Sequence, residues 1–298
     1  MSKIVLSAEQ RYGALQRPFF SGIIKNADRH RSMKSLRLYN DGLREFVQFR
    51  FQPSMDLLVV LVSFLSLIIT LYYTWKLFTI TSVLVPLSMF ILGVLIPILY
   101  NSFVKDQPLS EIGIRKTYWQ RSLVLGFILS ILIVIAPVPP GLTATTTTFI
   151  AAVKDLTFIE LLPLLALEIT AGLFWTIFFC GWIQLRFERA FGAIPAILVA
   201  AALFALHHAG YGETISPSHM VPLFMAGIVN STIFRITRNI LILWPFFIAK
   251  TGLSSDLLQW NLRLPFESTY TYFGVLILMW LSIAVTHYQQ KKAVSSQS

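Results

Sequence analysis

Several apolar stretches of this chain exceed the roughly 18 residues that a helix needs to cross a bilayer. Hydrocarbon offers no partner to backbone polar groups, so such stretches cross a membrane as helices. We therefore predict an all-α, polytopic transmembrane bundle of about eight helices. The predicted spans are 56–75, 79–101, 120–136, 157–185, 191–209, 219–234, 239–253 and 269–287.

The composition supports lipid as the main solvent. Only 13% of the residues are charged, against about 25% in soluble domains. The single cysteine, Cys180, excludes a disulfide framework within the chain and a zinc site built from cysteines. The net charge of +10 is typical of cytoplasmic loops that face anionic lipid. We expect membrane lipid as a partner and no nucleic acid.

The distribution of positive charge predicts the topology. If the N-terminus lies inside, the inside segments hold 20 of the 24 Lys and Arg residues. Such an asymmetry orients spans, so both termini are predicted to be cytoplasmic, with the protein in the plasma membrane. The inside segments are 1–54, 102–121, 186–189, 235–238 and 288–298. We divide the chain into a basic cytoplasmic or interfacial segment, 1–54, and a membrane domain, 55–290.

Ionisable residues inside spans are costly in hydrocarbon and mark candidate functional positions. Glu168 is either a candidate general base or a structural carboxylate that pairs with Lys250 or a histidine. His207 and His208 are adjacent and point about 100° apart on a helix, so at most one is expected to face a given site. The other candidates inside or at the ends of spans are Glu160, His219 and Asn230.

The run from Phe178 to Gln184 and, about thirty residues later, Phe204 with His208 resemble in their order two motifs of the CAAX-protease and bacteriocin-processing (CPBP) family. The run 175–184, which includes Phe-Phe-Cys-Gly-Trp-Ile-Gln, resembles the family's Glu-Glu-x-x-x-Arg-Gly motif. About thirty residues later, Phe204 and His208 match its Phe-x-x-x-His motif. Residues 108–116 look like the short loop before the family's core, and 224–247 resemble its later helices, so the resemblance covers roughly 108–253.

The resemblance implies a CAAX-protease-like fold and peptide hydrolysis within the membrane, near the C-terminus of prenylated substrates. In the family, the first glutamate of the first motif activates water. The second-motif histidine and a later His-x-x-x-Asn hold the water or an oxyanion. A divalent metal is a possible cofactor if the protein is active. A desolvated carboxylate beside a histidine is a reasonable general base.

The sequence departs from this pattern at its chemical positions. Trp175 and Thr176 replace the paired glutamates, and Cys180 replaces the arginine. The later histidine and asparagine align near Ala249 and Leu253. Of the catalytic set only His208 remains, with Glu168 and His207 as further candidate catalytic residues.

The predicted span ends also set positions 175 and 208 at different depths. Position 175 lies about 10 residues from the inner end of its span, and His208 lies about 16 residues from the start of the next. At 1.5 Å per residue the depths differ by roughly 9 Å.

Three functions remain open. The first is a non-catalytic or impaired CPBP protein that binds a membrane protein or lipidated peptide, because loss of the base from a cooperative site removes most of the rate. The second is an active endopeptidase that uses His208 with a relocated carboxylate such as Glu168. The third is a transporter or channel subunit.

Overall fold

The computed structural model describes residues 46–77, 83–115, 119–135, 156–211, 216–247 and 264–295, together with Lys154. Within these ranges every regular element is a helix and no strand occurs. Of the predicted N-terminal segment 1–54, only residues 46–54 are described.

Eight helical segments of eight residues or more follow one another in the described residues. They are α3 (Met55–Leu77), the continuous run Leu84–Val104, α6 (Trp119–Ile135), the continuous run Phe158–Phe191, α10 (Ala193–His207) with the turn η5 (His208–Tyr211), α11 (Pro217–Thr237), α12 (Ile240–Phe247) and α14 (Ser268–Ser295). Six are long and apolar enough to cross a membrane, α6 is a shorter apolar helix, and α12 has eight residues. The predicted all-α polytopic bundle of about eight helices is confirmed.

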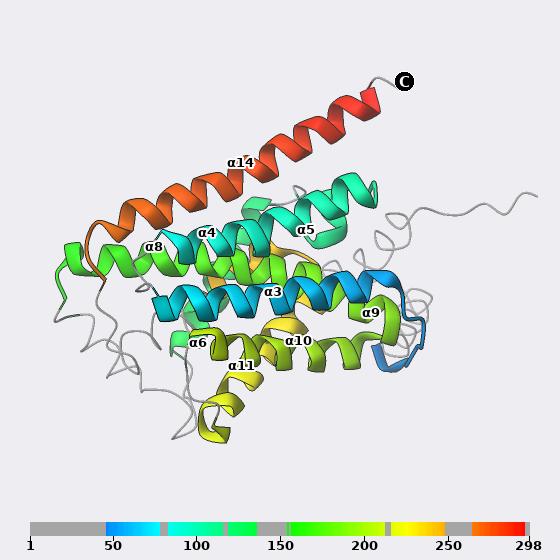
Figure 1. Ribbon diagram of the computed structural model, residues 1–298, viewed down its shortest axis with the longest axis horizontal. Helices are drawn as coiled ribbons and strands as arrows, with labels where there is room; N and C mark the ends of the chain where they lie inside the picture. Colours follow the sequence, from blue (N-terminus) through cyan, green and yellow to red (C-terminus); the bar gives the residue numbers. More distant parts are fainter. Residues whose placement is uncertain are drawn as a thin grey trace, which may run out of the picture.

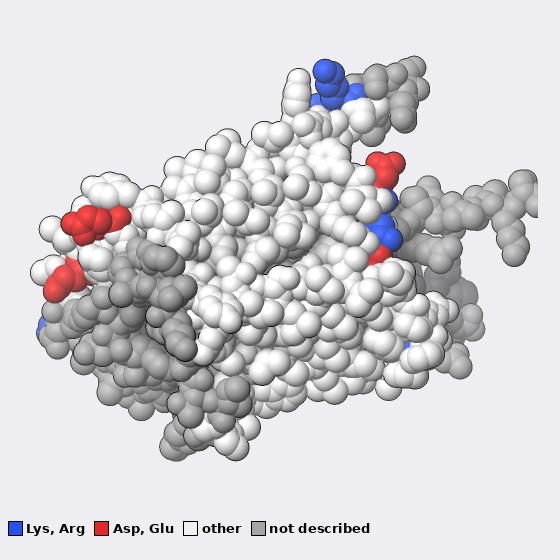
Figure 2. All heavy atoms as spheres, in the orientation of Figure 1, with Lys and Arg blue, Asp and Glu red and all other residues white. Residues whose placement is uncertain are grey.

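The segments run back and forth along one long axis (Figure 1). The start of α3, the turn after α9 (Leu185–Phe191) and the end of α14 lie toward the same end of the bundle. Figure 2 shows Lys, Arg, Asp and Glu at the two ends, with an uncharged belt between them. That belt contains many exposed apolar side chains, among them Leu65, Ile131 and Leu281. An integral, multi-pass membrane protein accounts for this pattern.

The longest helix runs through the middle of the bundle. It consists of α8 (Phe158–Trp175), the π-helical stretch η4 (Thr176–Gln184) and α9. A capping box starts it, in which the Thr157 side chain accepts from the Glu160 backbone and the Glu160 carboxylate accepts from the Thr157 backbone.

Gly192 ends this helix with a φ of +94°, a value that L side chains rarely adopt. A Cβ atom at this position would meet the backbone oxygen of Gln48 at 2.3 Å. The chain then turns directly into α10, so the two helices form a tight hairpin.

One sequence prediction about this hairpin was wrong. The fourth span was predicted to end at 185, but the helix continues to Phe191. Charged residues near this position suggested the end of the span. The structure instead buries one of them, Arg186, which is 2% exposed inside the helix.

The short 3-10 helix η3 (Leu109–Ile112) lies against η4. A Cβ atom on Gly181 would meet the backbone oxygen of Ile112 at 2.4 Å. The glycine of the first motif therefore allows close approach of the segment 108–116, which the sequence analysis placed before the core. Ile112 and the neighbouring Leu109 are both buried.

Close helix contacts complete the bundle. On α11, a Cβ atom at Gly227 would meet Ala201 Cα of α10 at 2.7 Å. Helices α6 and α12 also approach closely, and the Ser130 hydroxyl donates to the Pro245 carbonyl at 2.8 Å. On the other side of the long helix, the Thr170 hydroxyl donates to the Tyr272 carbonyl of α14 at 3.0 Å.

Candidate functional site

The hairpin brings Trp175 and His208 together. Trp175 precedes Gly192 by 17 residues, and His208 follows it by 16, so the two positions reach similar depths. Their ring centroids are 6.2 Å apart. The predicted depth difference of roughly 9 Å is wrong because α9 extends the first helix to Phe191.

The indole of Trp175 is hydrogen-bonded to His207. Its Nε1–H donates to His207 Nε2 at 2.9 Å. Because Nε2 is the acceptor, the ring proton lies on Nδ1, which contacts the Phe204 carbonyl and donates to it. His207 is fully buried. Both nitrogens of this imidazole are therefore engaged within the protein.

Both histidines contact Trp175, although the sequence analysis expected at most one to face a given site. The ring centroids of Trp175 and His207 are 5.7 Å apart, and those of the two histidines are 4.1 Å apart. Helix α10 ends at His207 and a 3-10 turn begins at His208, so the two side chains do not follow one continuous α-helix. His208 Nδ1 also lies 3.1 Å from the Phe204 carbonyl.

Aromatic rings surround these imidazoles. Phe179 lies 4.9 Å from His207 and 5.5 Å from Phe204, measured between ring centroids. Trp175 lies 6.0 Å from Phe204 in an edge-to-face arrangement. The position that the motif resemblance assigns to a carboxylate thus holds an aromatic ring packed on its neighbours.

The other two departures from the motif give no acid or base at this site. Thr176 is 1% exposed, and its hydroxyl donates to the Leu173 carbonyl at 3.1 Å. Cys180, which stands in place of the arginine, is 4% exposed and is a free cysteine. Ala249 and Leu253, at the later motif positions, lie outside the described residues.

Glu168 lies on a different part of the long helix. Its side chain is 1% exposed. Seven residues separate it from Trp175, which is about 10 Å along an α-helix. Helix α8 packs on α14, α12 and α4 (Leu84–Phe90), whereas η4 packs on α10. The catalytic roles of Glu168, His207 and His208 stay predictions.

The remaining candidates are distributed around the bundle. Glu160 caps the start of α8, and Asn230 is 5% exposed on α11. His219 belongs to α11, but its side chain is outside the described part of the structure, as is Lys250. The predicted pairing of Glu168 with Lys250 therefore falls outside the described residues.

The described residues here do not fit a divalent metal. Such an ion needs several oxygen or nitrogen ligands with free lone pairs. His207 Nε2 already accepts a hydrogen bond from Trp175, and Thr176 and Cys180 replace charged motif residues. No group of three or more His, Cys, Asp or Glu side chains is close enough to hold a metal ion in the described ranges.

The sequence model of the type II CAAX prenyl endopeptidase Rce1-like family matches residues 157–250. These residues are an Rce1-like domain of the CPBP family. The domain begins at the capping box of α8 and contains the hairpin and α11 and α12. The predicted kinship is confirmed, although the family match begins later than the predicted resemblance over 108–253. Neither a curated protein nor a solved structure matches the chain.

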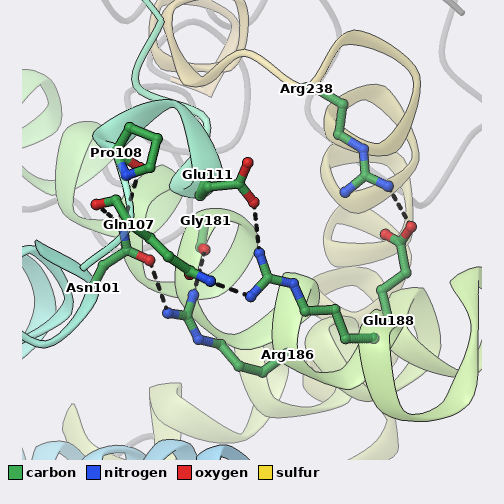
Figure 3. A network of polar contacts seen from close by, with 9 residues as sticks. Asn101, Gln107, Pro108, Glu111, Gly181, Arg186, Glu188 and Arg238 are labelled. Atoms are coloured by element: carbon green, nitrogen blue, oxygen red, sulfur yellow. Dashed lines mark hydrogen bonds and ion pairs between the residues drawn. The ribbon is translucent and has the colours of Figure 1, made fainter. Parts of the chain in front are cut away.

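In addition to the cluster around Trp175, the structure contains a polar network that was not predicted from the sequence (Figure 3). Arg186 donates to Asn101 Oδ1 at 3.2 Å and to the Gly181 carbonyl at 3.4 Å. Its guanidinium lies 3.9 Å from the centroid of the Trp182 ring, a cation–π distance. The sequence feature that could have indicated this network is Arg186, an arginine that follows directly after an apolar run.

Charged pairs continue this network across the end of the bundle. Arg189 donates to Glu111 at 2.8 Å, and Glu188 accepts from Arg238 (Figure 3 shows Glu111, Glu188 and Arg238). Arg235 Nε lies 3.0 Å from Glu188 Oε1 as an ion pair. These pairs connect α9 with η3 and with the end of α11.

A further ion pair lies at the same end of the bundle. Lys105 Nζ lies 2.6 Å from Asp56 Oδ1, and this carboxylate raises the pKa of Lys105.

Proposed function

We propose that this chain is a non-catalytic Rce1-like protein that binds a membrane protein or a lipidated peptide. The hydrogen bond from Trp175 to His207 carries the proposal. The Trp175 indole occupies the position that the resemblance assigns to the family's general base, and its N–H can donate a hydrogen bond but cannot accept a proton.

The chemistry of the site supports this. Hydrolysis needs a group that takes a proton from water, and an indole N–H has no lone pair for it. The Thr176 hydroxyl donates a hydrogen bond to a backbone carbonyl, and a hydroxyl is not a base near neutral pH. His207 uses both ring nitrogens. Loss of one member of a cooperative catalytic set removes most of the rate.

The nature of the partner follows from the family. The matching family acts, by its description, on prenylated chains, and this chain keeps the helices that form the corresponding domain. Aromatic rings in place of the family's paired glutamates suit an apolar ligand better than a charged ligand. We therefore expect the partner to be a membrane-embedded or lipid-modified segment that contacts α10 near the histidines.

Photo-crosslinking in native membranes tests both parts of this proposal. A crosslinking amino acid at Leu206 stands next to the histidines and is 42% exposed, and a control at Leu278 on α14 is 43% exposed. We expect the crosslinker at position 206 to capture a defined membrane protein or lipidated peptide. The crosslinker at position 278 should not capture that partner. Mass spectrometry should find the partner's C-terminus intact.

Two results would contradict the proposal. Recovery of the same proteins from both positions would show nonspecific contact with membrane proteins. Recovery of a partner that is truncated in the presence of this chain, and intact when Glu168→Gln and His208→Ala are introduced, would favour the active endopeptidase.

A further inference from the structure

A pocket separate from the aromatic cluster around Trp175 opens at the end of the bundle where α9 turns into α10. Four separate stretches line it: Arg50 before α3, η3 with the residues directly after it, the hairpin at Gly192, and the end of α11. Backbone hydrogen bonds hold the first stretch against the hairpin, since the Arg50 N–H donates to the Phe191 carbonyl at 3.1 Å. The pocket is therefore built from parts of the chain that only the fold brings together.

The lining is strongly positive. It contains the five arginines Arg50, Arg115, Arg189, Arg235 and Arg238 and the two glutamates Glu111 and Glu188. Five positive against two negative side chains leave an excess of three positive charges.

The two glutamates orient part of the lining. Glu188 contacts both Arg235 and Arg238, whose side chains are 16% and 10% exposed. Glu111 contacts Arg189. Guanidinium groups positioned in this way, and partly removed from water, bind an oxyanion more strongly than free surface cations do.

The start of α10 adds a second feature. Gly192 and Ala193 line the pocket, and Gly192 is the N-cap of this 15-residue helix. Glycine has no side chain to accept from the first backbone N–H groups, and no side-chain cap bond is present there. A helix N-terminus carries partial positive charge and exposes N–H donors, which together favour an anion.

The position of the pocket relates it to the membrane surface. Arg50 lies just before α3, and Arg238 is the C-cap of α11, so the lining belongs to the ends of the spans. Headgroup phosphates lie at this level of a bilayer, and anionic lipids attract clustered basic residues there.

We propose that this pocket binds a phosphate group, supplied either by an anionic lipid headgroup or by a soluble phosphorylated molecule. Planar guanidinium groups match the oxygen geometry of phosphate, and the backbone N–H of Ala193 at the start of α10 is a further donor at the edge of the pocket. The site is separate from the aromatic cluster around Trp175 and does not depend on whether the protein cleaves peptides.

The test uses the full-length chain in detergent and measures thermal unfolding as two probes are titrated. The first probe is phosphatidylglycerol, with phosphatidylcholine as its zwitterionic control. The second is inorganic pyrophosphate without added lipid. The variants are Arg50→Gln, Arg115→Gln and their combination. Arg121→Gln is the matched control, because Arg121 is an exposed arginine that does not line the pocket.

We expect a saturable rise in the unfolding temperature for the original chain and for Arg121→Gln. Each pocket substitution should raise the probe concentration needed for half of that rise by about tenfold, because it removes one charge-assisted contact. A rise in the unfolding temperature with phosphatidylglycerol but not with pyrophosphate identifies a lipid headgroup as the ligand. A rise with pyrophosphate as well identifies a soluble phosphate ligand.

Two outcomes would overturn the proposal. One is the absence of a saturable shift with either probe. The other is an equal shift in Arg121→Gln and in the pocket variants, which would place binding elsewhere on the basic surface. Measuring the single substitutions separately keeps the test valid if the combined variant does not fold.

Discussion

At the scale of single residues, Trp175 makes the site an aromatic, hydrogen-bonded cluster. Its indole occupies the position that the motif resemblance assigns to the family's water-activating carboxylate, and it donates to one histidine while its ring contacts the other. A buried donor and acceptor that satisfy one another stabilise the fold. We therefore expect Trp175 to contribute to the stability of the core.

Replacing Trp175 by Phe tests this structural role. The substitution keeps an aromatic ring but removes the N–H, which leaves His207 Nε2 buried without its donor. We expect the free energy of unfolding to fall by about 1–3 kcal/mol. Thermal or denaturant unfolding of the purified protein in detergent measures the change.

Trp119→Phe is the matched control, because Trp119 is 49% exposed at the start of α6. This control should change the stability by less than about 0.5 kcal/mol. Equal effects of the two substitutions would show that the Trp175–His207 hydrogen bond contributes nothing specific.

At the scale of helices, the hairpin of α9 and α10 sets the geometry of the site. The Gly192 turn places Trp175 and the histidines at the same depth, and Gly227 allows α11 to pack closely on α10. Small residues at such crossings let backbones approach within a membrane. The aromatic cluster keeps its shape only while this packing holds.

Gly227→Ala tests the packing of α10 against α11. The added methyl group would lie 2.7 Å from Ala201 Cα, so one of the two backbones must shift. We expect a loss of about 1–3 kcal/mol in unfolding free energy, which is typical of overpacking. Detergent-solubilised thermal unfolding gives the comparison.

Gly274→Ala on α14 provides the control, because nothing lies within 4 Å of its added Cβ. Alanine favours the helix, so this variant should be unchanged or more stable by up to about 1 kcal/mol. A neutral Gly227→Ala would mean that the two helices are less tightly packed than described.

Hydropathy was enough to predict the helices but not their ends. Long apolar runs identify spans because hydrocarbon leaves the backbone few alternatives. The end at 185 was wrong because Arg186, although charged, is stabilised inside the helix by Asn101 and the Trp182 ring. The contact with Asn101, 85 residues away in sequence, is not visible in local hydropathy.

The site was predictable only in part. The order of the two motifs was sufficient to recognise the family, and the replacement of the glutamates can be read directly from the sequence. The bond between Trp175 and His207 was missed because it depends on how the hairpin closes. The pocket of arginines was missed for the same reason, since its residues come from four stretches.

At the scale of the whole molecule, charge and fold agree on the topology that we propose. Among the described residues, Arg50 before α3 and Lys291 near the end of α14 belong to one end of the bundle, and Glu267 directly before α14 belongs to the opposite end (Figure 1). We propose that the basic end is cytoplasmic, as the positive-inside rule predicts.

Cysteine labelling tests this orientation. Cys180 is 4% exposed and gives little background, so Glu267→Cys and Lys291→Cys provide one reporter at each end. We expect a membrane-impermeant maleimide to label position 267 in intact cells and position 291 only after lysis. Labelling in the reverse order would contradict the orientation.

The most direct test of the central claim is cleavage of a prenylated peptide by the full-length chain in proteoliposomes, measured as release of the C-terminal fragment. The account predicts no release above that of protein-free liposomes, and no difference between the original chain, Glu168→Gln and His208→Ala. Fragment release that the original chain supports and either substitution abolishes would contradict it.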